Sequence, residues 1–130
     1  MLLRLARELR RETEALGVTS RQATLLSLIK EHPGLSLREL AVLERITAPS
    51  LSGHVDRLEQ ADLIERVRSG GDRRRVGLEL TTAGDRLLRK VRAQRTTWLA
   101  ERLAELSPDQ IDAIERAIEP LNALLSMGNA

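Results

Sequence analysis

The sequence has no cysteine, no phenylalanine and no tyrosine among its 130 residues, and Trp98 is its one tryptophan. Without cysteine the chain forms no disulfide and offers no thiolate to a metal ion or to an oxidant. Without phenylalanine or tyrosine the core must be built from Leu, Ile, Val and Ala, which at helical spacing pack one helix against another. We therefore expect a mainly α-helical fold.

The sequence also lacks a long apolar run. No stretch approaches the roughly 18 uninterrupted apolar residues that a membrane span needs, and Arg4 and Arg7 interrupt the leucine-rich start before it could act as a signal peptide. We expect a cytoplasmic protein without a membrane partner. With 42% hydrophobic and 31% charged residues, the chain should fold as a single domain over residues 1–130.

The net charge is only +2, but the charges are segregated along the chain. Arginines are concentrated in one short stretch: Arg66, Arg68, Arg73, Arg74 and Arg75. Acidic residues are frequent near the C-terminus: Glu101, Glu105, Asp109, Asp112, Glu115 and Glu119. Because local potential attracts phosphate more than net charge does, this segregation favours a polyanion as the partner of the basic stretch.

The first half of the chain predicts three helices. Leucines at helical spacing over residues 2–16 indicate an amphipathic helix that Gly17 ends. The Thr-x-x-Gln spacing at 19–22 is that of a capping box, and it predicts a helix over about 20–31. Ser36 and Glu39 repeat the signal and begin a short third helix that reaches about Leu43.

A fourth helix is predicted between Thr47 and about Ala61. Thr47 has the side chain of an N-cap, and Pro49 falls in the first turn, where its missing N–H costs nothing. Leu51, Val55 and Leu58 recur at intervals of four and three and must face inward. The residues that then point outward or flank the buried stripe are small or polar: Ser50, Ser52, Gly53, His54 and Arg57.

After the fourth helix the hydrophobic period changes from helix to strand. Residues 64–68 and 76–80 are short β-prone segments, and a loop with two glycines separates them. We predict a two-stranded hairpin. The arginine triplet in the stretch RSGGDRRRVGLEL would then lie at the tip of this hairpin.

Two further helices complete the chain. Thr81 or Thr82 caps a long helix that extends to about Leu106, and residues 107–110 combine a capping box with proline at the first helical position. Pro120 interrupts the apolar stripe of the last helix, where it either kinks the helix or ends it early. That stripe consists of Ile111, Ile114, Ile118, Leu121 and Leu125.

Three core helices followed by a hairpin form a winged helix-turn-helix. A small, polar outward face lets the fourth helix of the chain approach base edges in the major groove of DNA, where Arg57 and His54 would read bases. An arginine at the hairpin tip can enter the narrow, electronegative minor groove. Arg73, Arg75 and helix N-termini would hold phosphates. We therefore predict double-stranded DNA as the partner.

The stretch SLRELAVLERITAPSLSGHVDRLEQADLIERVRSGGDRRRVGLELTTAGDRLL resembles the multiple-antibiotic-resistance-regulator (MarR) family of bacterial transcription factors. Its wing pattern, Asp72-x-Arg74 followed after five residues by Leu80-Thr81-x-x-Gly84, matches this family in spacing and residue type. The resemblance extends over nearly the whole chain. It implies a homodimer on a pseudo-palindromic operator, often a repressor that a small-molecule ligand releases.

The resemblance also implies roles for single residues. Arg74 corresponds to the family's minor-groove arginine, and Asp72 to the acid that helps to hold the wing. The remaining DNA contacts correspond to Thr47, Ser50, Ser52, Gly53, His54, Arg57, Arg73 and Arg75. The DNA-binding core spans 18–82, and segments 1–17 and 83–130 form the dimer. The expected interface residues are Leu2, Leu5, Leu9, Trp98, Ile111, Ile114, Ile118, Leu121 and Leu125.

Several other interpretations stay open. The arginine triplet could be a solvated loop, His54, Ser50 and Ser52 could be ordinary surface residues, and Trp98 could line an effector pocket. A winged helix can also serve protein contacts without DNA, and occupancy of DNA can follow protein concentration alone. Catalysis has no constellation of residues here, so we expect neither an enzyme nor a cofactor or metal.

Overall fold

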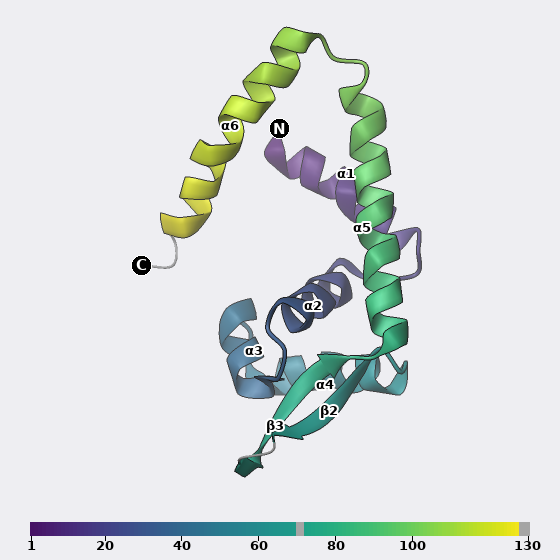
Figure 1. Ribbon diagram of the computed structural model, residues 1–130, viewed down its shortest axis with the longest axis vertical. Helices are drawn as coiled ribbons and strands as arrows, with labels where there is room; N and C mark the ends of the chain where they lie inside the picture. Colours follow the sequence, from purple (N-terminus) through teal and green to yellow (C-terminus); the bar gives the residue numbers. More distant parts are fainter. Residues whose placement is uncertain (70–71, 128–130) are drawn as a thin grey trace. The chain divides into compact units, whose positions relative to one another are not determined.

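The computed structural model describes residues 1–69 and 72–127, with the backbone alone at 69 and 72–75. Its contacts divide into two compact units, Met1–Arg95 and Thr96–Ala130. No helix in the described ranges is long and apolar enough to cross a membrane. The elements, all but β1 labelled in Figure 1, are α1 (Leu2–Glu14), α2 (Ser20–Glu31), β1 (Leu35–Ser36), α3 (Leu37–Glu44), α4 (Ala48–Gln60), β2 (Ile64–Ser69), β3 (Asp72–Leu80), α5 (Thr82–Leu103) and α6 (Pro108–Met127). The expected mainly helical fold with a small β-sheet is confirmed.

The predicted helix starts are confirmed by their capping hydrogen bonds. The backbone N–H of Gln22 donates to the Thr19 side chain over 3.1 Å, and the backbone N–H of Thr19 donates to the Gln22 side chain over 3.0 Å. Ser107 and Gln110 form the same reciprocal pair at the start of α6. Of the two threonines proposed as the cap of α5, Thr81 is the cap, because its hydroxyl accepts from the N–H of Gly84, and Thr82 is the first residue of the helix. These bonds satisfy amide groups that the first helical turn leaves without partners.

The core of the first unit lies between α2, α3, α4 and the sheet. Each helix contributes leucine, isoleucine or valine at helical spacing, and the sheet contributes one face of its strands. The largest fully buried aliphatic side chains are Leu25, Leu26, Ile29, Leu40, Leu51, Val55, Leu58, Ile64, Leu78 and Val91. Apart from Val91, which packs in a second, smaller cluster with Val18 and Ala23, these side chains form one continuous cluster that fixes the orientation of α4 relative to the sheet.

The sheet has three strands in the order β1-β3-β2, so the expected two-stranded hairpin gains a short third strand. Leu35 pairs with Leu78, and Ser36 pairs with Gly77. A Cβ atom on Gly77 would lie 2.6 Å from the carbonyl oxygen of Gly34, so only glycine permits this approach. Strand β1 was missed because two residues carry no periodicity signal.

The end of α5 differs from the prediction, and the course of α6 decides between the two effects predicted for Pro120. Helix α5 ends at Leu103 rather than near Leu106, because the N–H groups of Glu105 and Leu106 donate three residues back and tighten the chain out of the α-helix. Helix α6 continues past Pro120 to Met127, so this proline does not end it. The one lost backbone hydrogen bond is tolerated within a helix of 20 residues.

Helix α1 is attached to the first part of α5 by side-chain hydrogen bonds. Arg95 donates from Nε to the hydroxyl of Thr13 over 2.8 Å, and Thr13 is fully buried. Gln94 donates to the carboxylate of Glu12 over 2.7 Å. The expected helix over 2–16 thus has a polar as well as an apolar attachment, although it ends at Glu14.

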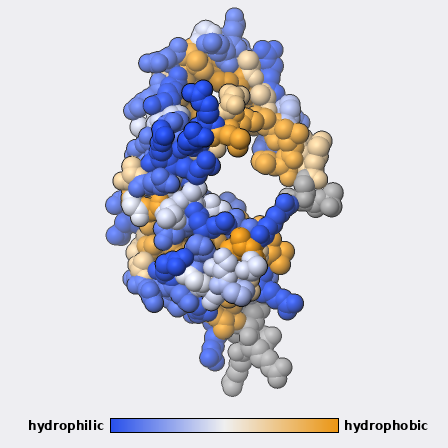
Figure 2. Space-filling model, turned by 180° about the vertical axis from the view of Figure 1, so that it is seen from behind, coloured by the Kyte–Doolittle hydropathy of each residue, from blue (hydrophilic) through white to orange (hydrophobic). Residues whose placement is uncertain are grey.

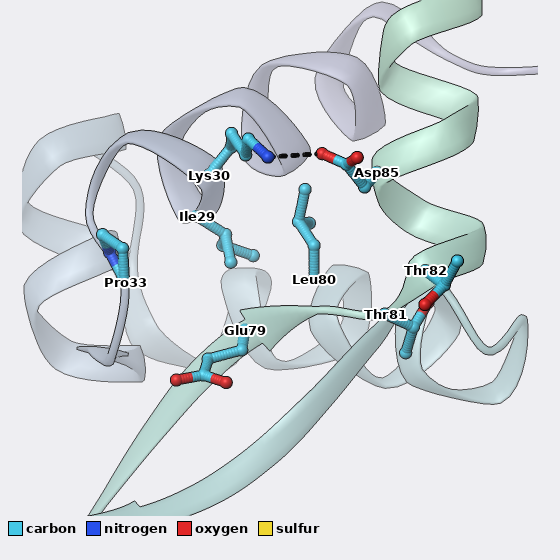
Figure 3. Close-up of a pocket in the computed structure, with 8 residues that line it drawn as sticks. All are labelled: Ile29, Lys30, Pro33, Glu79, Leu80, Thr81, Thr82 and Asp85. Atoms are coloured by element: carbon cyan, nitrogen blue, oxygen red, sulfur yellow. Dashed lines mark hydrogen bonds and ion pairs between the residues drawn. The ribbon is translucent and has the colours of Figure 1, made fainter.

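An ion pair joins α2 to the start of α5 beside an open cleft of about 600 Å³ (Figure 3). The Lys30 ammonium lies 2.6 Å from the Asp85 carboxylate, which Arg89 also contacts at 2.8 Å. The hydrogen bond from Lys30 lowers the pKa of Asp85 below its ordinary value of 3.8, burial opposes this shift, and the positive charges of Arg89, Lys30 and Arg92 reinforce it. Asp85 also lies in the first turn of α5, where negative charge is favourable.

Asp85→Asn should therefore destabilise the fold in a pH-dependent way. A carboxyl whose pKa is lower in the folded than in the unfolded state stabilises the fold above the unfolded pKa, and this contribution is lost as the pH falls through the folded pKa. The melting temperature of the variant should lie below that of the wild type at pH 7, and the difference should shrink below about pH 4. Asp112→Asn, which removes a carboxylate without an ion pair among the described residues, is the control. An equal difference at pH 7 and pH 3 would contradict this role of the ion pair.

Candidate nucleic-acid interface

Helix α4 forms where the sequence predicts it and with the predicted inward face. The N–H of Ser50 donates to the Thr47 hydroxyl over 3.3 Å, and proline falls in the first turn. Leu51, Val55 and Leu58 have no exposed surface. The inward stripe and the N-cap are therefore confirmed. Because this stripe is locked in the core, the opposite face of α4 must point away from it.

The outward face of α4 carries the polar residues that the sequence singled out. Ser50 and Arg57 are exposed, while Ser52, Gly53 and His54 are partly buried. No large apolar side chain belongs to this face. A helix with this surface can approach a polar, charged partner without burying an unsatisfied group.

His54 and Arg57 interact with each other on this face. The Arg57 Nη2 atom lies 3.0 Å from Nδ1 of His54. Arginine has hydrogen-bond donors only, so Nδ1 of the imidazole must accept, and the ring proton is on Nε2. The pair therefore presents donors alone to its surroundings: the N–H at Nε2 of His54 and the remaining N–H groups of Arg57. Donors of this kind match the N7 and O6 acceptors of guanine in the major groove.

The sequence alone did not reveal the acidic side of α4 or the arginine that bridges its two carboxylates. Arg66 of β2 lies 3.1 Å from the Asp56 carboxylate and 3.2 Å from the Glu59 carboxylate. Arg66, which we had grouped with the basic stretch, instead bridges α4 to the hairpin. All three groups are partly exposed, so the bridge orients the two elements more than it stabilises the fold. Acids three residues apart on a helix, followed by an arginine on the next strand, are the signal that could have revealed it.

The hairpin of β2 and β3 extends away from the helices of the first unit (Figure 1). Its register is antiparallel from Ile64 opposite Leu80 to Ser69 opposite Asp72, with an irregularity between Arg68 and Ser69. The segment 73–75 belongs to β3, so the arginine triplet lies in the strand and not at the tip as expected. Strand β3 therefore starts at Asp72 rather than near 76, and its register passes from Val76 opposite Arg68 directly to Asp72 opposite Ser69, so segment 73–75 forms an irregularity with no partner in β2. The roles expected of the Asp72, Arg73, Arg74 and Arg75 side chains lie outside the described residues.

The expected dimer residues are mostly accessible in the single chain. Helix α6 has no buried residue, and Figure 2 shows apolar atoms exposed along it towards its C-terminal end. Leu9, Trp98 and Ile111 are half-buried. The exposed members of the set are Leu2, Leu5, Ile114, Ile118, Leu121 and Leu125.

Trp98 lies in the second unit under the guanidinium of Arg102, which is 3.8 Å from the ring centroid. Arg102 also donates to the backbone carbonyl of Trp98 over 3.0 Å. This cation–π contact was not foreseen, although a spacing of four residues on one helix permits it. It covers one face of the indole with a charged group.

Comparison with known proteins agrees with this geometry. A model described as MarR family matches residues 16–75. The HTH-type transcriptional repressor MdtR of Bacillus subtilis is 33% identical over 104 residues, which cover 80% of this chain and 67% of that protein. The HTH-type transcriptional regulator FarR of Neisseria gonorrhoeae is 32% identical over 78% of this chain and 62% of that protein.

Solved structures share the fold. The YusO protein from Bacillus subtilis superposes with a TM-score of 0.80 at 29% identity, over 94% of this chain and 86% of that one. FabT of Streptococcus pneumoniae, solved in complex with DNA, has a TM-score of 0.72 at 22% identity, over 84% of this chain and 76% of that one. Taken with the winged helix-turn-helix, these matches establish that the chain belongs to the MarR family of transcriptional regulators.

Proposed function

We propose that this chain represses transcription as a homodimer that binds a pseudo-palindromic site on double-stranded DNA. The observation that carries the proposal is the outward face of α4, which is locked in place by a buried leucine and valine stripe and offers hydrogen-bond donors without apolar bulk. A face of this kind meets the requirements of major-groove entry. A docking surface for a protein would instead need apolar anchors on that face.

Within this proposal the residues divide their roles by chemistry. His54 and Arg57 read base edges, because their donors face away from the core. Arg73 and Arg75 hold phosphates, and Arg74 enters the minor groove beside the site of α4. Thr47, Ser50 and Ser52 lie in the first half of α4 or at its cap, where their hydroxyls can bind phosphate.

Arg66 supports this interface indirectly. Asp56 and Glu59 on α4 would repel DNA phosphates if they stood alone. Arg66 contacts both carboxylates and so offsets one of their two negative charges, while it ties the recognition helix to the strand that leads to the arginine triplet. Helix and wing would therefore meet the two grooves in a fixed relative orientation.

The exposed apolar side chains of α1 and α6 support a homodimer. Ile118 is 53% exposed and Leu125 is 74% exposed in the single chain. Such a stripe is costly in water and is satisfied when a second copy covers it. Two-fold symmetry would place the two recognition helices about 34 Å apart, which is one turn of DNA.

Replacing Arg57 or Arg74 by alanine should weaken binding to a duplex that the wild-type protein selects from a random library. We expect a loss of about 1 to 3 kcal/mol for each, with unchanged folding and dimerisation. Fluorescence anisotropy at several salt concentrations measures both the affinity and the number of phosphate contacts. Lys90→Ala, which removes an exposed charge from α5, is the control. Wild-type affinity in both arginine variants would remove their side chains from the interface.

Placing a charge on the apolar face of α6 should separate the subunits. Leu121→Glu leaves the fold of one chain intact because Leu121 is 40% exposed there. Burying the new carboxylate against a second copy would be strongly unfavourable. Sedimentation equilibrium should give a dimer for the wild type and for the control Arg116→Glu, and a monomer for Leu121→Glu. A dimeric Leu121→Glu variant would show that this face is not the interface.

A further inference from the structure

Gly53 differs from the other glycines that lie within the elements of the first unit. A Cβ atom at Gly84 would lie 1.9 Å from the carbonyl oxygen of Leu63, and one at Gly77 would lie 2.6 Å from that of Gly34. The fold itself therefore requires glycine at both positions. Among the described residues, a Cβ added at Gly53 would meet no atom within 4 Å apart from its chain neighbours and the backbone of its own helix, and the backbone is not in the left-handed region. No contact in the described part of the chain requires glycine at this position.

Glycine at this position is nevertheless costly. Gly53 is the sixth residue of a 13-residue helix, well inside both ends. Glycine in a helix interior is less favourable than alanine because it loses more backbone freedom on folding. The packing of this chain does not compensate for that loss, so a requirement from outside the chain is needed to account for the residue.

The position of Gly53 on α4 indicates what that requirement is. Each residue of an α-helix turns by about 100°, so Gly53 lies almost opposite the buried stripe of Leu51, Val55 and Leu58. Ser50 is three residues before it and Arg57 four residues after it, so both lie on its face. The missing side chain thus leaves a hollow in the middle of the donor-bearing surface.

The dimensions of the DNA major groove indicate what this hollow is for. An α-helix with its side chains is about 10–12 Å across, and the major groove is about 12 Å wide and 8.5 Å deep. A helix that enters so narrow a groove reaches its floor only where its own side chains are small. We infer that Gly53 is the point at which the backbone of α4 comes into van der Waals contact with DNA. This contact lets the helix lie deep in the groove. The short Ser50 and the His54–Arg57 pair therefore reach base edges.

This inference rests on the proposed function, and it predicts effects of opposite sign on folding and on binding. Gly53→Ala should raise the melting temperature by about 3 to 5 °C, because alanine is the better helix former and has free space. The same variant should bind the duplex selected by the wild type about 10-fold more weakly, and Gly53→Leu should bind it at least about 100-fold more weakly. The reason is that the free-energy cost of overpacking a close contact grows with the size of the side chain.

The experiment combines thermal denaturation with anisotropy titrations of the selected duplex and of an unrelated duplex of equal length. Ala93→Leu places the same leucine side chain at an exposed site on α5 and should leave binding unchanged. Gly84→Ala should lower the melting temperature, because the fold requires glycine at this position. This change is opposite in sign to the change expected for Gly53→Ala. Binding of the unrelated duplex should change less than binding of the selected one, because phosphate contacts do not depend on helix depth to the same extent.

Two outcomes would overturn the inference. Wild-type affinity of Gly53→Ala and Gly53→Leu for the selected duplex would show that DNA does not approach Gly53 closely. A lower melting temperature of Gly53→Ala would show that the fold does require glycine there. If the wild-type protein itself selected no duplex, the proposed function would fail instead, and this result is distinct from both.

Discussion

The burial of Leu51, Val55 and Leu58 is the constraint on which the rest of the first unit depends. All three side chains are fully enclosed between α2, α3 and the sheet, so α4 cannot rotate about its axis without exposing them. Each of these side chains contributes about 1.5 to 3 kcal/mol when it is buried. This burial makes the outward face of α4 a fixed surface in the absence of any partner.

A second contact couples this surface to the hairpin. Arg66 reaches from β2 to two carboxylates on α4, and the short strand β1 holds β3 from its other side through the close approach of Gly77 to Gly34. Exposed ion pairs contribute little to stability. Their value here is geometric, because they relate the recognition helix to β2, the strand that pairs with the one carrying the arginine triplet. The family to which the chain belongs and the geometry of α4 and the hairpin thus both indicate DNA binding.

The sequence predicted those features that depend on local chemistry. Thr19, Ser36, Thr47 and Ser107 cap helices because their side chains accept from amides three residues on, and this spacing is visible in the letters. The inward stripe of α4 follows from its period alone. The core and the outward face could therefore be assigned without coordinates.

Features that depend on pairing between distant segments could not be read in the same way. Strand β1 exists only because β3 offers it a free edge, and the Arg66 bridge needs the turn that brings β2 beside α4. The two glycines beside the arginine triplet predict a loop with the triplet at its tip, whereas segment 73–75 belongs to β3 and Asp72 beyond it still pairs with Ser69. The role of Gly53 also cannot be inferred from the sequence, because it depends on comparing the free space around Gly53 with the close contacts around Gly84.

The most direct test of the central claim is selection of bound duplexes from a random library by the purified full-length protein, repeated at two salt concentrations. The account predicts enriched sequences with two inverted half-sites whose centres are about one helical turn apart, and an affinity that falls steeply as salt rises. Failure to retain any duplex, even at low salt, would contradict it. Enrichment of single, unpaired half-sites by a monomeric protein would contradict the proposed binding as a two-fold symmetric dimer.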